Sequence, residues 1–376
     1  MGISDVVILA GGIGERLWPL STKEHPKQFI KVEEGLSFFQ MSLRRAAALK
    51  PASSILVVTR REFVDLAADQ CREFADSLAA VERSFFEEKI FVIPEPEAKH
   101  TAAAIYFACR FIIARQSGSA FSDSGKEHTV LVLTSDHIIK PTEYFLDACE
   151  SAVRAAQENY FVCFAIKPDF PSTEFGYIQT GARNPDDEAV FDIAAFHEKP
   201  GEAAARDYLA AGNYWWNSGM FAFAASFLLE EIQAYAPEIA EAFSVLHGVP
   251  KLKTCKKIKI MLAWHGLENA YQKTPAIAID RAVAEKTKRA RCVLAHFEWY
   301  DAGSWDAFTG CVPAPDENHV LVQCDDCYVH SDIPVALCGV SGVTVVIKDG
   351  KALVLQKGSS PLVQEAVKQM QTILRR

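Results

Sequence analysis

Up to about residue 165, short apolar runs alternate with longer stretches of helical spacing, and this alternation limits the possible folds more than any other feature. Apolar residues that recur about every 3.6 positions predict helices, and short continuous apolar runs predict buried strands. Such alternation is typical of βαβ units around a mostly parallel sheet, which binds ligands at the carboxyl ends of its strands. Predicted strands cover residues 6–9, 54–59, 90–93, 129–133 and 160–165, and predicted helices cover 38–49, 98–115 and 143–159.

Beyond residue 170 the pattern changes to antiparallel-looking strands mixed with helices, and near the C-terminus to short strands separated by glycines. We therefore expect an α/β fold: a Rossmann-like mixed, mostly parallel sheet flanked by helices, in residues 1–310, and a small β-rich domain in residues 311–376. The Asp-Gly pair at 349–350 predicts a hairpin turn. Further predicted strands cover 175–180, 189–198, 218–223, 319–322, 335–337, 343–348 and 351–355, and further predicted helices cover 224–235, 280–286 and 361–374.

Charge and composition limit the possible partners. The 376 residues include 39 Lys and Arg against 48 Asp and Glu, a net charge of −9, which argues against a general nucleic-acid surface. We find no apolar run near the ~20 residues of a membrane span and no signal peptide, so we expect a cytoplasmic protein without nucleic-acid or membrane partners. The ten cysteines fit reduced thiols; Cys324 and Cys327 lack a second pair at zinc-site spacing, and their role stays open.

A glycine-rich loop follows the first predicted strand. Residues 10–16 read AGGIGER, where glycines let backbone N–H groups approach a ligand, and Arg16 and Lys27 add two cations suited to a polyphosphate. A plain turn after a strand is the alternative. This loop does not match two common phosphate-binding patterns. It lacks the third glycine of the dinucleotide-binding pattern G-x-G-x-x-G, and it lacks the Gly-Lys-Ser/Thr of the P-loop.

This loop and several later segments resemble the nucleoside-diphosphate-sugar pyrophosphorylases, a family of nucleotidyltransferases, and in particular the mannose-1-phosphate guanylyltransferases. The resemblance covers roughly residues 5–310 and implies that 1–310 form the catalytic domain. It also implies that the C-terminal domain is β-helix-like and helps to form a homodimer. The similar segments are LWPL (17–20), PKQF (26–29), TSDH (134–137), FGYI (175–178), HEKP (197–200), WNSGMF (216–221) and DAGSW (301–305).

The reaction that this resemblance implies joins two anions. An oxygen of mannose 1-phosphate attacks the α-phosphorus of GTP, pyrophosphate leaves, and GDP-mannose forms. Cations must offset the repulsion between the phosphates, and Mg²⁺ is typically held by few carboxylates and by phosphate oxygens. The resemblance implies Asp136 and Asp301 as the Mg²⁺ ligands. For each, an ordinary loop aspartate or a helix cap is the alternative, especially for Asp301, which precedes a helix.

The resemblance also assigns roles to other residues near the loop. The implied catalytic residues are Arg16, Lys27, Asp136 and Asp301, with Arg16 and Lys27 stabilising charge on the phosphates. The substrate phosphate is already ionised, so no protein nucleophile is needed, and we expect His137 to orient its neighbours rather than to act as a base. The implied nucleotide-binding residues are Ala10, Gly11, Gly12, Gly14, Arg16 and Ser135.

A second set of residues is implied for the sugar phosphate. Glu198 and Asn217 offer hydrogen-bond partners for hydroxyl groups, and Lys199 offers a cation for the phosphate. A solvated turn is the alternative for residues 198–200. The full implied set is Gly176, Glu198, Lys199, Asn217 and Asp280, and Asp280 is also a candidate helix cap.

One departure from the family leaves the base open. Lys99 and His100 stand where the family usually has Arg-Asn, and a lysine does not replace the bidentate fork of an arginine. Two alternative functions therefore remain. One is a pyrophosphorylase for another sugar nucleotide, using glucose 1-phosphate with UTP or dTTP. The other is a non-catalytic regulatory subunit that binds a sugar nucleotide, although the presence of all four implied catalytic residues favours an active enzyme.

Overall fold

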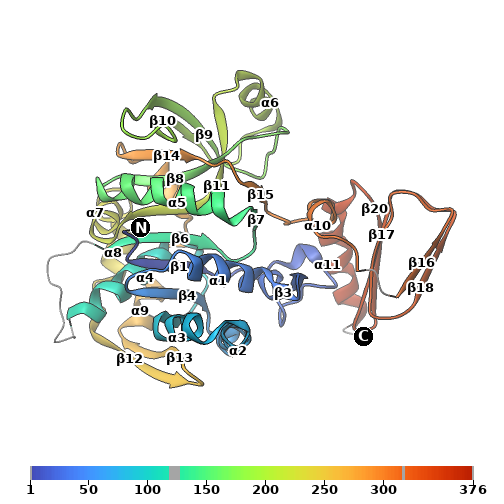
Figure 1. Ribbon diagram of the computed structural model, residues 1–376, viewed down its shortest axis with the longest axis horizontal. Coiled ribbons are helices and arrows are strands. Elements are labelled where there is room, and N and C mark those ends of the chain that lie inside the picture. Colours follow the sequence, from blue (N-terminus) through green and yellow to red (C-terminus); the bar gives the residue numbers. More distant parts are fainter. Residues whose placement is uncertain (1, 118–127, 316–317, 375–376) are drawn as a thin grey trace. The chain divides into compact units, whose positions relative to one another are not determined.

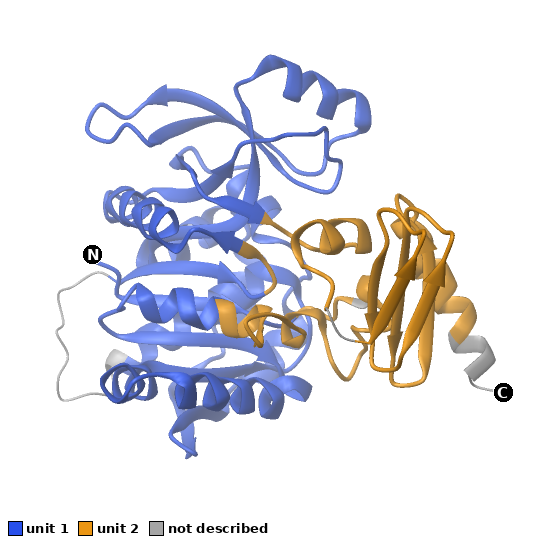
Figure 2. Cartoon of the chain, turned by 45° about the vertical axis from the view of Figure 1, so that its right-hand side comes forward, with its two compact units in different colours: residues 1–11, 42–135, 139–299 blue, residues 12–41, 136–138, 300–376 orange. Residues whose placement is uncertain are grey.

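The computed structural model describes residues 2–117, 128–315 and 318–374, and the chain divides into two compact units (Figure 2). Unit 1 comprises residues 1–11, 42–135 and 139–299, and unit 2 comprises residues 12–41, 136–138 and 300–376. Most of the glycine loop therefore belongs to the same unit as the C-terminal segment. The division into domains at residue 310 stays a prediction.

Within the described residues, eleven strands form the mixed sheet of unit 1 (Figure 1). Parallel pairing runs without interruption from β13 through β5, β4 and β1 to β6, and antiparallel pairs gather around β11, β10 and β9. The predicted mixed α/β sheet is thus confirmed. Its strands are β1 (Asp5–Leu9), β4 (Ser54–Arg60), β5 (Ile90–Glu95), β6 (Thr129–Thr134), β8 (Phe161–Ile166), β9 (Tyr177–Arg183), β10 (Val190–His197), β11 (Tyr214–Ala224), β12 (His247–Cys255), β13 (Ile258–His265) and β14 (Ala290–Leu294).

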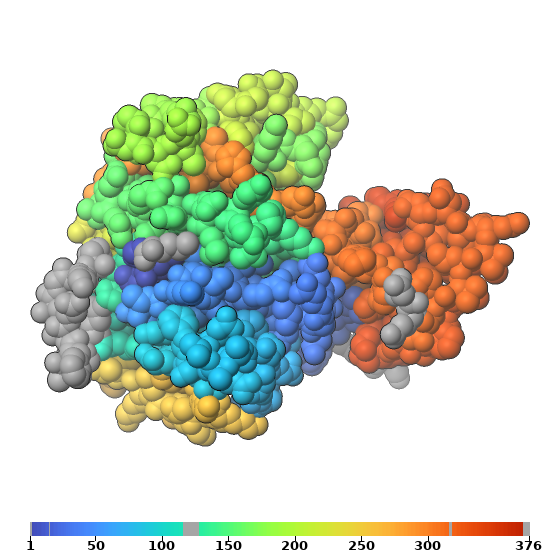
Figure 3. Space-filling model, in the orientation of Figure 1, coloured from blue at the N-terminus to red at the C-terminus, as the bar shows by residue number. Residues whose placement is uncertain are grey.

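Helices cover both faces of this sheet, which explains why its central strands are apolar along their whole length. Helices α4, α7, α8 and α9 share one hydrophobic core with the sheet, and α2 and α5 pack on the opposite face, where Figure 3 shows α2 and α3 in cyan. The helices are α1 (Phe38–Ala48), which begins in unit 2, α2 (Val64–Ser77), α3 (Ala80–Lys89), α4 (His100–Ser117), α5 (Thr142–Gln157), α6 (Glu202–Ala211), α7 (Ala225–Tyr235), α8 (Pro237–Phe243) and α9 (Leu267–Lys273), with a short 3-10 turn η3 (Arg61–Phe63).

Most predicted elements are confirmed within a few residues. The helix predicted over 280–286 is present but shorter and of another type: η4 (Asp280–Ala284) is a π-helix, in which the N–H of Glu285 donates to the carbonyl of Asp280, five residues back. Helices α2 and α3 and the β12–β13 hairpin are among the elements that the sequence patterns did not predict. None of the described helices combines the length and apolar composition of a membrane span.

Unit 2 has its own core, built around the fully buried Trp305, whose indole N–H donates to the carbonyl of Trp18 at 3.0 Å. This contact fixes the segment after the glycine loop against α10. The elements that lie in or enter unit 2 are η1 (Glu15–Leu17), η2 (Lys27–Phe29), β2 (Lys31–Glu33), β3 (Leu36–Ser37), β7 (Ile138–Lys140), β15 (Glu298–Tyr300), α10 (Trp305–Cys311), β16 (His319–Val322), β17 (Tyr328–Ser331), β18 (Val335–Cys338), β19 (Val343–Lys348), β20 (Lys351–Gln356), η5 (Ser360–Leu362) and α11 (Val363–Leu374).

The C-terminal strands form a short coil of β-helix type. Paired residues stand sixteen positions apart throughout: His319 pairs with Val335 and Tyr328 with Thr344, both in parallel, with an isolated parallel bridge between residues 325 and 341. A constant offset means that one turn of chain lies on the next, as the predicted β-helix-like domain requires. The predicted hairpin turn at 349–350 joins β19 to β20, with positive φ at both residues.

Candidate active site

Lys27 lies between two aspartates that are far from it in sequence, all within unit 2. Its ammonium nitrogen is 3.1 Å from Oδ2 of Asp136 and 3.2 Å from Oδ1 of Asp301, and it also donates to the backbone carbonyl of Asp301. The lysine side chain is 5% exposed, while those of the aspartates are 36% and 26% exposed. A buried cation is thus paired with two carboxylates that solvent can still reach.

The glycine loop and the segment after it hold Lys27 in place. Gly14 has a φ of +57°, and a Cβ added there would lie 2.7 Å from Cβ of Lys27, so this position requires glycine. The side-chain amide of Gln28 donates to the carbonyl of Gly12 at 2.9 Å. The loop is therefore closed onto the Pro-Lys-Gln-Phe segment by local contacts, and this explains why both patterns occur together in the sequence.

The charges of this group stabilise one another. Burial alone raises the pKa of Asp136, but the ammonium of Lys27 and the imidazole of His137 outweigh it and hold that pKa below its usual value. Burial disfavours the charge on Lys27, yet the two aspartates raise its pKa above the usual value. Near neutral pH the Lys27 ammonium is therefore protonated and the Asp136 carboxylate is ionised.

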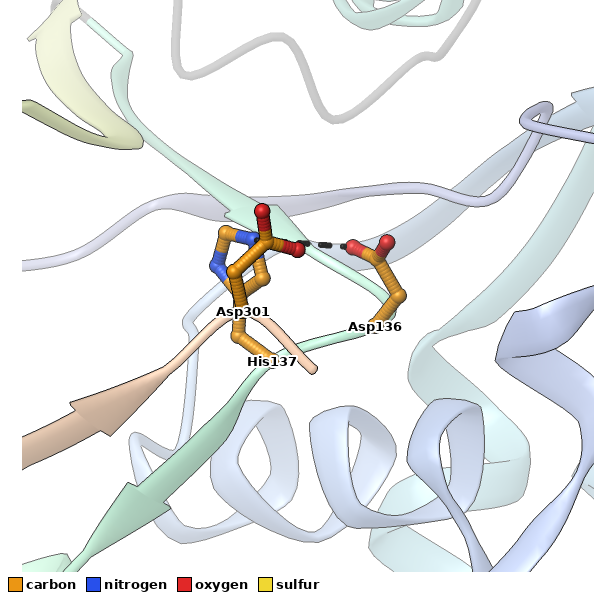
Figure 4. A group of neighbouring side chains, drawn as sticks. All are labelled: Asp136, His137 and Asp301. Carbon is orange, nitrogen blue, oxygen red and sulfur yellow. Dashed lines mark ion pairs between the residues drawn. The ribbon is translucent and has the colours of Figure 1, made fainter. Parts of the chain in front are cut away.

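The same residues could hold a divalent cation. Asp136, His137 and Asp301 each offer one ligand atom, and these atoms lie within 4.8 Å of one another (Figure 4). Nε2 of His137 is 3.7 Å from Oδ1 of both aspartates. Two carboxylates and an imidazole suit a divalent ion that takes its other ligands from water or phosphate. Asp301 does not cap the following helix, because Ser304 does so by accepting from the N–H of Ala307.

The remaining predicted nucleotide-binding residues lie in both units. Arg16 is exposed in η1, and Gly12 has open space around it. In unit 1, Ser135 is buried directly after β6, and the N–H of Ala10 donates to the carbonyl of Val58 at 2.8 Å. The Ala10 amide thus belongs to the sheet, and the role of all these residues in nucleotide binding stays a prediction.

The predicted sugar-phosphate residues come together within unit 1. The backbone N–H of Asn217 donates to the carbonyl of Gly176 at 2.8 Å, and its side-chain amide donates to Oδ1 of Asp280 at 2.7 Å. A Cβ on Gly176 would lie 2.6 Å from Oε2 of Glu198, so a larger residue at this position would displace the Glu198 carboxylate. Lys199, with a positive φ of 50°, places its ammonium 3.9 Å from Oε1 of Glu198.

Negative charge accumulates in this second group. Burial and the nearby carboxylate of Asp280 raise the pKa of Glu198 to about 7, against a weaker opposing effect of Lys199. Burial likewise raises the pKa of Asp280, although its own backbone N–H and Asn217 oppose the shift. With the largely exposed Lys199 beside two close carboxylates, Glu198 is therefore only partly ionised at neutral pH.

Glu95, which the sequence analysis did not select, lies beside the start of the glycine loop in unit 1. Its Oε1 accepts a 3.0 Å hydrogen bond from the hydroxyl of Tyr271, and its Oε2 would lie 3.1 Å from a Cβ on Gly11. Burial raises the pKa of Glu95 to about 8. The available signal was its place at the carboxyl end of a buried strand, just before the Lys99-His100 departure.

The cysteines show no sign of pairing in the described residues. All ten are free, and the thiols of Cys324 and Cys327 donate to backbone carbonyls of their own coil.

Comparisons with known proteins converge on one family. A protein-family model described as nucleotidyl transferase matches residues 5–314. A mannose-1-phosphate guanylyltransferase of Sinorhizobium fredii is 36% identical over 300 residues, which are 80% of this chain and 53% of that protein, so the chain spans about half of its length. A mannose-1-phosphate guanylyltransferase of Klebsiella pneumoniae is 33% identical over 375 residues, 96% of this chain and 72% of the relative. A crystal structure from Thermus thermophilus, described as a mannose-1-phosphate geranyltransferase, is 30% identical with a TM-score of 0.78, covering 99% of this chain and all of that one.

Proposed function

Because the chain belongs to the nucleotidyl transferase family, we propose that it transfers a guanylyl group from GTP to α-D-mannose 1-phosphate, giving GDP-mannose and pyrophosphate. The observation that carries this proposal is the pairing of Lys27 with Asp136 and Asp301, which lie 109 and 274 residues away in the sequence. Such a convergence of one cation and two carboxylates suits the handling of a triphosphate.

In the proposed reaction a phosphate oxygen of the sugar 1-phosphate forms a bond to the α-phosphorus of GTP. The bond from that phosphorus to the β-phosphate bridging oxygen breaks, and pyrophosphate leaves with that electron pair. Asp136 and Asp301 would hold a divalent cation such as Mg²⁺, which when bound neutralises phosphate charge. Arg16 and Lys27 stabilise negative charge on the phosphates, and the glycine loop offers backbone donors.

The second group serves the sugar phosphate in this proposal. Glu198 accepts from sugar hydroxyls, Asn217 is held by Asp280 so that its amide oxygen stays oriented, and Lys199 meets the phosphate. Gly176 leaves room for the backbone to approach the ring. No step requires a proton to be abstracted, so orientation and charge neutralisation supply the catalysis.

Glu95 supports guanine as the base. When ionised, the Glu95 carboxylate can accept from both the N1–H and the exocyclic amino group of guanine, a pair of adjacent donors that uracil and thymine do not offer. Because burial raises the pKa of Glu95 to about 8, these two hydrogen bonds must also offset the cost of ionising it when the base binds. Glu95 lies beside Gly11, at the start of the loop assigned to the nucleotide, and its Oε1 is already oriented by Tyr271. Base selectivity would then not depend on Lys99 and His100.

The proposal extends to the setting of the enzyme. Ten free thiols are in keeping with a reducing cytoplasm. A homodimer formed through the C-terminal coil is supported by exposed apolar side chains on it, among them Val320, Ile333 and Val354. Light scattering at micromolar concentration should give a dimer, and Val354→Asp should weaken it; a monomeric wild-type protein would contradict this part of the proposal.

A matrix of nucleotides and sugar phosphates tests the activity directly. Purified protein is incubated with Mg²⁺, one of GTP, UTP and dTTP, and either mannose 1-phosphate or glucose 1-phosphate, and pyrophosphate release is measured. We expect the highest kcat/KM for GTP with mannose 1-phosphate. Turnover confined to UTP or dTTP with glucose 1-phosphate would favour the alternative pyrophosphorylase, and tight binding of sugar nucleotides without turnover would favour a regulatory subunit.

The role of Glu95 has its own test. Glu95→Gln replaces one acceptor oxygen by a donor, so we expect the Kd for GTP to rise about 10- to 100-fold, as for a lost charged hydrogen bond. ITP lacks the exocyclic amino group and serves as the matched ligand: wild type should prefer GTP over ITP, and Glu95→Gln should lose much of this preference. An unchanged GTP-to-ITP ratio would remove Glu95 from base recognition.

A further inference from the structure

Lys27 has no N–H group left for a phosphate. An ammonium group has three donors, and within residues 2–117, 128–315 and 318–374 the acceptors around Lys27 are also three: Oδ2 of Asp136, Oδ1 of Asp301 and the carbonyl of Asp301. Each of these acceptors belongs to one of the two aspartates that could also hold a divalent cation. In this arrangement the lysine is directed entirely at the aspartates.

The proposed function requires something different, because it places the ammonium of Lys27 on a phosphate and a divalent cation on the aspartates. We propose that Lys27 is an exchangeable internal cation: Asp136 and Asp301 give up its ammonium when a divalent cation enters with the triphosphate, and the freed N–H groups turn to the phosphates. This inference rests on the proposed function and adds an order of events to it.

Charge makes the exchange necessary. Lys27 and a divalent cation draw on the same two carboxylate groups, and at the short distances of this cluster two cations repel each other strongly. A divalent cation alone must therefore displace a buried ammonium whose ion-pair partners, in the part of the chain that the structure describes, are these two aspartates. A triphosphate supplies that anion, so the protein binds the divalent cation weakly without nucleotide and more tightly with it.

The local structure allows the side chain to move while its backbone stays fixed. The residues of η2 are buried, and the carbonyl of Lys27 accepts from the N–H of Ile30. Gly14, in the loop assigned to the phosphates, passes directly against Cβ of Lys27. In this proposal rotation about the side-chain bonds carries the ammonium from the aspartates toward that loop, and His137, 3.7 Å from both carboxylates, would serve as a third ligand.

Titration calorimetry with MnCl₂ in the absence of nucleotide tests the exchange without measuring activity. Lys27→Gln removes the charge but keeps a donor for the carbonyl of Asp301, so we expect it to bind Mn²⁺ at least tenfold more tightly than wild type. Lys27→Arg keeps the charge and should bind as weakly as wild type. Lys31→Gln, the same change at an exposed residue of β2, is the matched control and should also resemble wild type. Equal Mn²⁺ affinity of Lys27→Gln and wild type would overturn the proposal.

Removal of the buried ammonium brings two carboxylates together uncompensated, so Lys27→Gln could unfold. In that case Mn²⁺ should restore a cooperative thermal transition, because the ion supplies the missing positive charge; failure to restore it would equally overturn the exchange. Asp136→Asn in the Lys27→Gln background should cancel the gain in Mn²⁺ affinity. None of these measurements requires turnover, so an enzyme that made no GDP-mannose would refute the proposed function and leave the exchange to be judged by itself.

Discussion

The two acidic groups of the molecule differ in how their negative charge is balanced. In unit 2 a buried lysine pairs with Asp136 and Asp301, and the pKa of Asp136 falls below its usual value although burial opposes the shift. In unit 1 Glu198 and Asp280 have the largely exposed Lys199 as their near cation, and the pKa of Glu198 rises to about 7. The pKa values of similar residue types thus shift in opposite directions in the two groups.

This difference fits two kinds of ligand. A carboxylate that stays charged because a cation is built in can exchange that cation for another, as handling of a metal and a triphosphate requires. A carboxylate that is only partly charged near neutral pH suits neutral hydroxyl groups, which accept or donate hydrogen bonds without bringing charge. Burial is therefore not what separates the two groups; the position of the nearest lysine is.

The largest effect is expected where the carboxylate charge is essential. Asp136→Asn removes a charged partner of Lys27 and a proposed metal ligand, so we expect kcat/KM for GDP-mannose synthesis to fall about 100- to 1,000-fold or more. Pyrophosphate release at saturating Mg²⁺ measures it. Asp349→Asn, at the exposed tip of the β19–β20 turn, is the matched control and should keep wild-type activity. Full activity of Asp136→Asn would show that the carboxylate charge in unit 2 is not needed, and would contradict the proposed difference in role between the two acidic groups.

A smaller effect is expected from breaking the hydrogen bond between Asn217 and Asp280 in the acidic group of unit 1. Asn217→Ala removes the amide that donates to the buried Asp280, and this should lower the free energy of unfolding by about 1–3 kcal/mol. It should also raise the KM for mannose 1-phosphate more than it lowers kcat. Urea unfolding and steady-state kinetics measure the two effects. Asn184→Ala controls for loss of an asparagine, because Asn184 is a half-buried residue directly after β9 whose side chain accepts from the nearby N–H of Asp186. A change confined to the KM for GTP would contradict the assignment to the sugar.

The sequence predicted the framework well because apolar periodicity is a local signal. The strands β1, β4, β5, β6 and β8 appear where buried apolar runs occur, and the coil of β16, β18, β19 and β20 follows its glycine spacing. It did not predict the π-helical form of η4, nor the hairpin β12–β13, whose edge strand β12 is mostly exposed and so lacks a clear apolar alternation.

For the candidate site the sequence predicted which residues belong to it, but not the contacts they make with one another. Lys27, Asp136 and Asp301 could be named from a resemblance, yet their mutual contacts join residues 109 and 274 positions apart, which no local pattern encodes. Glu95 was missed for the same reason, since its significance comes from lying beside Gly11 and Tyr271 in the folded chain.

The comparison predicts a pH-dependent contribution to stability from Glu198 and a constant one from Asp136, which metal-free urea unfolding in EDTA can measure between pH 5 and 8. The pKa of Glu198 rises from 4.5 to about 7 on folding, so the folded protein keeps a proton that the unfolded chain has lost, and wild-type stability falls as pH rises through this window. Glu198→Gln lacks this loss and should gain about 1–3 kcal/mol over wild type between pH 5 and 8. The pKa of Asp136 lies below 3.8 in the folded protein, so its contribution is fully present above pH 5, and the penalty of Asp136→Asn should stay constant across the same window. If both differences were flat with pH, the two groups would have the same charge balance, and the proposed division of roles would lose its physical basis.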